Sequence, residues 1–462
     1  MTAALALALV VGTTTACSSS DSSGAAASSA STSKPPNVYE KQRQDGVQKV
    51  LDALGSAVQS GDTGKLDKLF DPLAAPEFRN TFRQMQQALG QAPKSAAGRG
   101  SRLRLKTFDY QVAPDDSSER QLGGELAVKL SDAGSTDSWV APVKLNYALG
   151  GAALPGVDEP EISLSSYLVF TRYDDDWKLL GGEELAPDPS LDPTEQKRPP
   201  ELGPWAFDGV AAADAKTAGG DSAVLSYPDT DRTATSIRKQ FPAAVAAVTA
   251  FWGDDWPRKA VVTVTGTDAQ FAGFTRTAPG TTAAAAAATV YSRIDKASKT
   301  VVGQRVVFSP AARELSDAGI GVVLRHELTH VAARLQTADG APMWLTEGVA
   351  EYVGRKGSYQ KLEQAAPDLA AQVAAGDVPT VLPSDSEFGV DDDTARIAYQ
   401  TAWSFAAYIA GKYDEKHLKA MYLAVAKGGD SAKIDAALRQ TIGKDKKALV
   451  ADWGAWLRGQ VR

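Results

Sequence analysis

The chain has 462 residues, of which 23% are charged, and its formal net charge is −7 at pH 7. This length predicts two domains, and the acidic balance offers no basic surface for nucleic acid. A single cysteine excludes a disulfide within one chain. Beyond the N-terminus, no segment reaches the roughly 18 apolar residues that a membrane-spanning helix needs.

The N-terminal residues are typical of an export signal. A short apolar stretch, residues 3–11, precedes small residues that end in Cys17. This arrangement resembles a bacterial lipoprotein signal peptide, which implies that residues 1–16 are removed and that Cys17 is diacylated. The protein would then be lipid-anchored on the extracytoplasmic face of the cell membrane. An ordinary secretory signal with an incidental cysteine is the alternative. Residues 17–37 are mostly Ser and Ala, which predicts a disordered tether.

Residues 38–186 predict a first domain in which helices precede antiparallel strands. Apolar residues recur at helical spacing from Val47 to Val58 and from Phe78 to Leu89. Alternating apolar and polar residues predict strands over 103–112, 126–130, 143–149, 164–172 and 177–180. This order resembles the cone of nuclear transport factor 2-like domains. That fold often provides a ligand pocket, but the domain lacks a convergent set of titratable residues, which favours a spacer or interaction module.

A second domain follows a proline-rich linker. Residues 187–204 contain six prolines, and residues 205–462 form the predicted second domain. Its strands are expected near 223–226, 260–264, 289–294 and 305–308, with a helix over 237–251. After Trp344 the pattern is helical. The sequence therefore predicts an α+β protein, with a helix-plus-antiparallel-sheet N-terminal domain and then a sheet followed by a mostly helical C-terminal part.

Two of the three histidines lie in one short motif, His326-Glu327-Leu-Thr-His330. On a helix the two imidazoles project from one face and can bind one cation, and Glu327 lies within reach of a metal-bound water. A catalytic zinc site needs a third protein ligand and an open position for that water. The remaining histidine, His417, lies in a charged segment that is expected to be solvated. The predicted helix also carries a core-facing apolar stripe of Ile320, Leu324, Leu328, Val331 and Leu335.

A carboxylate is the best candidate for the third ligand. Glu347 lies in a second helical stretch, residues 343–353, after a loop with glycine and proline. A helix–loop–helix hairpin would fold Glu347 back onto the histidine pair. Glu351 is one turn further along the same face, where it can accept the free ring N–H of a histidine ligand.

Together these two stretches resemble the gluzincin metallopeptidases, and most closely the bacterial peptidase MA-like domains. The resemblance covers residues 322–352. It implies one zinc ion per chain, held by His326, His330 and Glu347, with Glu327 as the general base and a peptide or protein as substrate. It also implies that a strand before the motif helix pairs with the substrate backbone.

A later segment, residues 396–408, resembles the tyrosine-bearing helix that follows the zinc site in peptidase MA-like proteins. This makes Tyr399 the candidate donor of a hydrogen bond to the oxyanion, with Arg396 on the same face one turn earlier. Helix packing alone is the alternative role for Tyr399.

The predicted function is that of a membrane-anchored, extracytoplasmic zinc metallopeptidase, a hydrolase in which Glu327 removes a proton from a zinc-activated water. The alternative is a non-catalytic envelope lipoprotein that binds a partner through its N-terminal domain and keeps the zinc site as a scaffold. The presence of Glu327 favours the enzyme, because a scaffold has no need of a general base.

Overall fold

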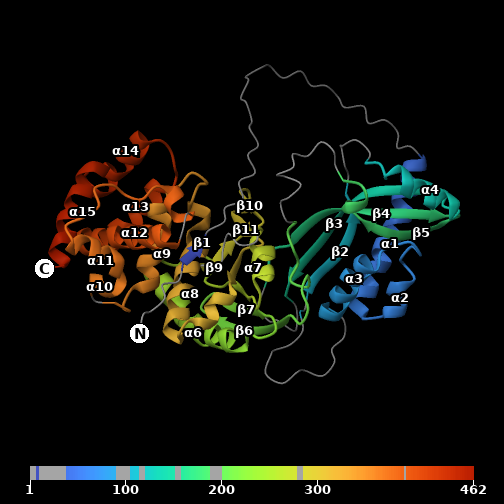
Figure 1. Cartoon of the computed structure of the whole chain (residues 1–462), viewed down its shortest axis with the longest axis horizontal. Coiled ribbons are helices and arrows are strands. Elements are labelled where there is room, and N and C mark those ends of the chain that lie inside the picture. Colours follow the sequence, from blue (N-terminus) through green and yellow to red (C-terminus); the bar gives the residue numbers. More distant parts are fainter. Residues whose placement is uncertain are drawn as a thin grey trace, which may run out of the picture.

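The computed structural model describes residues 7–9, 38–89, 103, 105–113, 120–150, 158–187, 200–277, 285–359, 361–389 and 392–461. They form an α+β molecule with an N-terminal antiparallel sheet and a mostly helical C-terminal part (Figure 1), which confirms the predicted class. Cys17 and the predicted tether lie outside the described residues. No helix in the described part of the chain is long and apolar enough to cross a membrane.

The N-terminal unit is a four-stranded antiparallel meander with a long helix packed on it. Its strands are β2 (Leu105–Val112), β3 (Asp137–Leu149), β4 (Ile162–Tyr173) and β5 (Asp176–Gly182), and its first helices are α1 (Val38–Ser60), α2 (Thr63–Asp67) and α3 (Pro76–Leu89). The apolar face of α1, including Val47, Leu51 and Leu54, is fully buried in one cluster with Phe170 and Leu179 of the sheet. Helical periodicity in the sequence therefore matches the buried face of α1.

One predicted strand in this unit is wrong. Residues 126–130 lie in a helix, α4 (Gly124–Asp132). Leu126 and Leu130 are one helical turn apart and join the apolar cluster on the other face of the sheet, whereas Val128 is 60% exposed. The leucines that pack on the sheet are four residues apart, as in a helix, so the alternation of apolar and polar residues does not decide the local structure.

The two units pack directly on each other. Trp205 lies edge-on to Phe108 and Tyr147 of the N-terminal sheet, with ring centroids 5.5 and 4.8 Å apart. Glu159 accepts the backbone N–H of Leu149 at 3.0 Å and forms a buried ion pair with Arg305 of the second unit. This boundary contains both apolar and charged contacts, so the N-terminal unit is docked on its neighbour.

The second unit contains a six-stranded mixed sheet of order β1-β9-β12-β8-β7-β6. These strands are β1 (Leu7–Leu9), β6 (Ala211–Thr217), β7 (Gly220–Ser226), β8 (Val261–Val264), β9 (Ala285–Val290) and β12 (Arg305–Phe308), with a separate hairpin of β10 (Arg293–Asp295) and β11 (Thr300–Val302). β1 runs parallel to β9, on the side opposite β12. The strand predicted over 289–294 is interrupted, because β9 ends before β10 begins.

Helices α6 (Asp231–Trp252), α7 (Asp268–Thr275) and α8 (Asp317–Ala333) belong to the same unit. The predicted apolar stripe of α8 is buried from Ile320 to Val331, in one cluster with α6 and the sheet. Leu335 departs from the prediction and is 43% exposed. The reason is local: α8 ends at Ala333 and the chain continues as a 3-10 turn, Arg334–Gln336, which changes the direction of the next side chains.

The C-terminal part consists of α9 (Met343–Arg355), α10 (Leu362–Ala365), α11 (Pro367–Ala374), α12 (Asp392–Tyr413), α13 (Glu415–Val425), α14 (Ser431–Ile442) and α15 (Lys446–Gln460). α9 packs closely between α8 and α12. A Cβ atom at Gly348 would lie 2.6 Å from the carbonyl oxygen of Ala402, and one at Gly354 would lie 2.9 Å from that of Val322. Only glycine fits at these two positions, and this close packing brings Glu347 to α8.

Candidate metal centre

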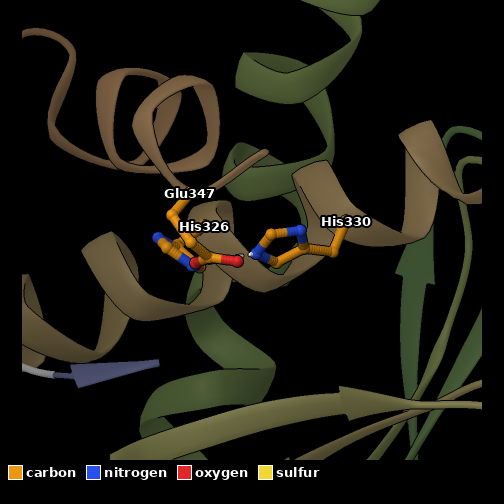
Figure 2. A group of neighbouring side chains, drawn as sticks. All are labelled: His326, His330 and Glu347. Carbon is orange, nitrogen blue, oxygen red and sulfur yellow. Dashed lines mark hydrogen bonds and ion pairs between the residues drawn. The ribbon is translucent and has the colours of Figure 1, made fainter. Parts of the chain in front are cut away.

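Helices α8 and α9 place three donor atoms around one point (Figure 2). The Nε2 atoms of His326 and His330 are 3.0 Å apart, and Oε2 of Glu347 lies 3.3 and 3.4 Å from them. Ligands at about 2.05 Å from a tetrahedral zinc ion stand about 3.3 Å from one another. The three predicted ligands therefore form a triangle of the size that zinc requires.

The buried carboxylate of Glu347 also fits a bound cation. Its side chain is fully buried, and neither of its oxygens has a hydrogen-bond partner among the described residues. Oε2 lies at ion-pair distance from both imidazoles without the geometry of a hydrogen bond. Buried carboxylates that lack hydrogen bonds are costly, so the missing partner is best supplied by a metal ion.

The charges in the centre couple metal binding to protons. Burial alone would lower the pKa of His326, but Glu347 and Glu351 outweigh it and raise this pKa to about 10. Burial also disfavours the ionised form of Glu347, yet His330 and His326 lower the pKa of its carboxyl to about 2. Without metal, His326 thus holds a proton that an incoming cation must displace, and affinity for the metal should fall as the pH falls.

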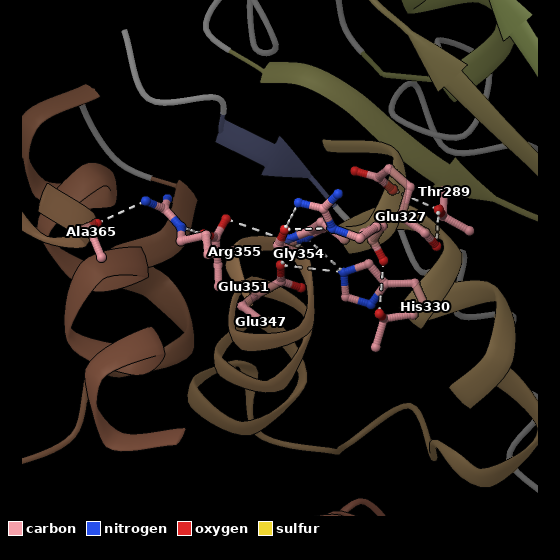
Figure 3. Close-up of polar contacts among 11 residues, drawn as sticks. Thr289, Glu327, His330, Glu347, Glu351, Gly354, Arg355 and Ala365 are labelled. Carbon is pink, nitrogen blue, oxygen red and sulfur yellow. Dashed lines mark hydrogen bonds and ion pairs between the residues drawn. The ribbon is translucent and has the colours of Figure 1, made fainter. Parts of the chain in front are cut away.

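Glu351 orients His326 from the side opposite the metal centre. Its Oε1 lies 3.2 Å from His326 Nδ1, which leaves Nε2 directed at the triangle. Its Oε2 pairs with Arg355 Nε, and Arg355 Nη1 donates to the carbonyl of Ala365 at 2.8 Å (Figure 3). Burial raises the pKa of Glu351, but Arg355 and His326 prevail and lower it. This chain of contacts fixes the ring of His326.

Glu327 is fully buried beside the two histidines. Its Oε2 accepts a 2.6 Å hydrogen bond from Thr289 Oγ1 on β9, as Figure 3 shows. Its Oε1 has no hydrogen-bond partner in the described part of the chain. Burial raises the pKa of Glu327, while the imidazoles and Thr289 oppose this rise. One oxygen is thereby anchored, and the other is available to accept a proton.

Helix α12 brings Tyr399, but not Arg396, into the surroundings of the centre. Tyr399 is 1% exposed and lies edge-on to Phe388. Its pKa lies well above the usual value, because of burial first and then the charges of Glu347, Glu351 and Glu327. Arg396 is one-third exposed and is paired with Asp368 and Asp393 at 2.9 and 2.7 Å.

His417 is also outside the metal centre, as the sequence predicts. Its half-exposed imidazole lies 2.8 Å from Asp414, at the start of α13.

A cavity of about 220 Å³ adjoins the centre, and its wall includes His330 and Glu347. Thr289, Arg334 and Tyr422 also line it, and sequence reasoning missed all three. Arg334 follows His330 by one helical turn, a spacing that could have indicated it. Thr289 and Tyr422 come from distant segments, and nothing in the sequence pairs them with the motif.

A comparison with protein families finds a match in the second unit. Residues 308–459, from the end of β12 into α15, match the model of the Peptidase MA superfamily. A comparison with curated proteins found no match.

Solved structures that align with the chain include M1 zinc metallopeptidases. A glutamate-to-alanine mutant of such an enzyme from Deinococcus radiodurans aligns at 12% identity and a TM-score of 0.31, over 53% of this chain and 51% of that chain. The chain thus spans about half the length of that enzyme. A two-domain M1 zinc metallopeptidase mutant bound to L-arginine aligns at 11% identity and a TM-score of 0.32, over 70% of this chain and 90% of that chain. The Deinococcus mutant bound to a Tyr-Ser-Ala substrate aligns at 11% identity and a TM-score of 0.29, over 80% of this chain and 74% of that chain.

Proposed function

We propose that the protein is a zinc-dependent metallopeptidase. The observation that carries this proposal is the buried triangle of His326, His330 and Glu347, with the unpartnered oxygen of Glu327 beside it. The match of residues 308–459 to the Peptidase MA superfamily supports it. A purely structural zinc site would be closed by a fourth protein ligand and would need no buried base.

The residues of the centre have distinct roles in the proposed reaction. Zinc held by His326, His330 and Glu347 would supply Lewis-acid activation of a water and of the scissile carbonyl. Glu327 takes a proton from the attacking water through Oε1 and passes it to the leaving amine. Tyr399 donates a hydrogen bond to the developing oxyanion, and its raised pKa keeps the hydroxyl protonated at neutral pH.

The edge of β9 offers a place for the substrate backbone. Thr289 on this strand donates a hydrogen bond to Glu327. One edge of β9 pairs with β12, and the opposite edge pairs with β1. Residues 7–9 belong to the predicted signal peptide. Once they are removed, a peptide substrate can pair with β9 as an added strand next to the general base.

Two measurements test the proposed peptidase. Zinc-loaded protein should contain one zinc per chain by elemental analysis, and a chelator should abolish cleavage of a responsive peptide from a library. Glu327→Gln should retain zinc and lose activity by about 100-fold or more, because an amide cannot accept the proton. Glu314→Gln, an exposed carboxylate beyond the centre, is the matched control. Zinc below about a tenth of an equivalent, or parent-like activity of Glu327→Gln, would refute the proposal.

We also propose that Cys17 carries a lipid anchor that holds the enzyme at the extracytoplasmic face of a bacterial cell membrane. This proposal rests on the N-terminal sequence alone. Cys17→Ser should move the protein from the membrane fraction to the soluble exported fraction. An unchanged distribution would contradict the anchor while leaving export intact.

A further inference from the structure

We propose that Arg334 forms a carboxylate-binding subsite beside the metal centre, so that preferred substrates carry a carboxylate close to the scissile bond. The inference rests on the proposed peptidase function and specifies the substrate class. Arg334 lies one helical turn beyond His330, in the 3-10 turn that ends α8. Its side chain lines the same cavity as His330 and Glu347.

Arg334 is a buried cation that forms no ion pair within the described part of the chain. It is 9% exposed, and no carboxylate in the described ranges forms an ion pair with it. Its Nη2 donates to the carbonyl of Thr337, and its Cζ lies 4.9 Å from the ring centroid of Tyr291. Its Nε has no hydrogen-bond partner among the residues that the structure describes. Burying an unpaired charge is costly, so an anionic partner from solution would complete this site.

None of the carboxylates that line the cavity forms an ion pair with Arg334: Glu347 lies beside the two histidines, and Asp339 is exposed. Tyr422 lies 2.9 Å from Thr337 Oγ1, which itself donates to the carbonyl of Ala333, so the tyrosine is the donor in this pair. Burial raises the pKa of Tyr422 to about 12, and the hydroxyl is neutral at pH 7. Asp385 is exposed and accepts the N–H of Met343 at 2.7 Å.

The size and shape of the subsite restrict the ligand. A cavity of about 220 Å³ holds a single residue of a peptide, since pockets for drug-sized ligands reach roughly 300 to 1,000 Å³. A guanidinium fork matches a carboxylate through two parallel hydrogen bonds. The carboxylate can belong to an acidic side chain or to the C-terminus of the substrate.

Binding to zinc-loaded Glu327→Gln protein tests the subsite without cleavage. Three probes are compared by calorimetry: a hexapeptide blocked at both ends with a central glutamine, the same peptide with glutamate there, and the glutamine peptide with a free C-terminal carboxylate. At least one carboxylate probe should bind about 10-fold or more tightly than the blocked probe. The probe that gains affinity identifies the source of the carboxylate.

Variants made in the same Glu327→Gln background assign the preference to Arg334. Adding Arg334→Gln should reduce the preference to about twofold or less, and Arg334→Lys should reduce it by about threefold, because an ammonium lacks the fork. Arg313→Gln is the control, since Arg313 also donates to backbone carbonyls but lies outside the cavity. If Arg334→Gln fails to fold, as judged by circular dichroism, the lysine variant decides.

Equal affinity for the three probes, absence of binding, or a preference that survives the Arg334 substitutions would overturn the inference. Failure of the proposed peptidase is recognised separately, by the zinc content and by the cleavage assay of the parent protein. Binding is also measured after zinc removal, so that loss of the metal is not mistaken for loss of the subsite.

Discussion

Two buried carboxylates, Asp71 in the N-terminal unit and Glu347 in the metal centre, have opposite surroundings. Both are fully buried. Asp71 accepts hydrogen bonds from Leu73 N, Thr171 Oγ1 and Tyr173 Oη at 2.8, 2.5 and 2.9 Å. Neither oxygen of Glu347 has a hydrogen bond in the described part of the chain. The fold thus satisfies a carboxylate that joins the loop after α2 to β4, and leaves incomplete one whose partner must come from solution.

A related difference, in ion pairing, separates two arginines that are largely withdrawn from solvent. Arg305 at the boundary between the units has Glu159 as its ion-pair partner. Arg334 beside the metal centre has no such partner within the described residues, although it is nine-tenths buried. Glu347, which has no hydrogen bond, and Arg334, which has no ion pair in the described part of the chain, therefore line the same cavity, where a ligand is expected to bind.

Exchanging the two carboxylates for neutral residues should give opposite results, and this is the largest expected effect. Glu347→Gln should weaken zinc binding by about 100-fold or more, because an amide is a poor zinc ligand. Asp71→Ala should leave zinc binding unchanged and lower the free energy of unfolding by about 2 to 3 kcal/mol, since three donors lose their acceptor. Zinc titration and urea unfolding measure the two effects. Weaker zinc binding by Asp71→Ala would contradict the assignment of a structural role to Asp71 and a metal-binding role to Glu347.

Tyr399→Phe tests whether the buried hydroxyl near the three glutamates acts in catalysis. If it donates to the oxyanion, kcat should fall roughly 10- to 1,000-fold while KM changes little, because the hydrogen bond forms chiefly in the transition state. Tyr408→Phe, on the same helix but in the packing against Trp456, is the control. An unchanged kcat for Tyr399→Phe would leave this tyrosine a packing role only.

Thr289→Val is expected to have the smallest effect and to appear in the pH profile. Burial raises the pKa of Glu327 and the Thr289 hydrogen bond opposes this rise, so removing the hydroxyl raises the pKa further. The base is then protonated at higher pH, and the acidic limb of kcat/KM should shift to higher pH, with kcat at its plateau reduced by about 10-fold or less.

The control for this change is Thr275→Val, which removes a buried hydroxyl bonded to the carbonyl of Phe271. The acidic limb of its kcat/KM profile should stay at the pH found for the parent protein. If the acidic limb of Thr289→Val also stays at the parent pH, the hydrogen bond from Thr289 does not affect the pKa of Glu327.

The parts of the site that sequence could predict are those that depend on helical spacing. Helix geometry relates His326 to His330 on α8 and Glu347 to Glu351 on α9, and the hairpin between the two helices brings the pairs together. Within the first domain, the same logic failed for residues 126–130, because five residues fit both alternation and a helical turn. Only the packing of Leu126 and Leu130 on the sheet decides between them.

The remaining parts depend on contacts between distant segments. Thr289 reaches Glu327 because β9 lies beside α8, and Arg355 reaches Ala365 across a turn. No local pattern encodes these pairings. Arg396 shows that a shared helix face can also mislead. The sequence places it one turn before Tyr399, but ion pairs with two aspartates hold it at the surface. Face and spacing along one helix therefore do not decide which neighbours a side chain finds.

The origin of the ligands within one helical hairpin has a consequence for the order of folding. His326, His330 and Glu347 all lie in the α8–α9 segment, whereas Thr289 and Tyr399 come from β9 and α12. Closing a short loop costs less entropy than joining distant segments, so the hairpin can assemble early and α12 and β9 join it later. The nascent chain would then acquire its metal before its base is anchored. Under the proposed function, hydrolytic competence would then arise only with the completed fold, and the protein would not act on its own unfolded segments.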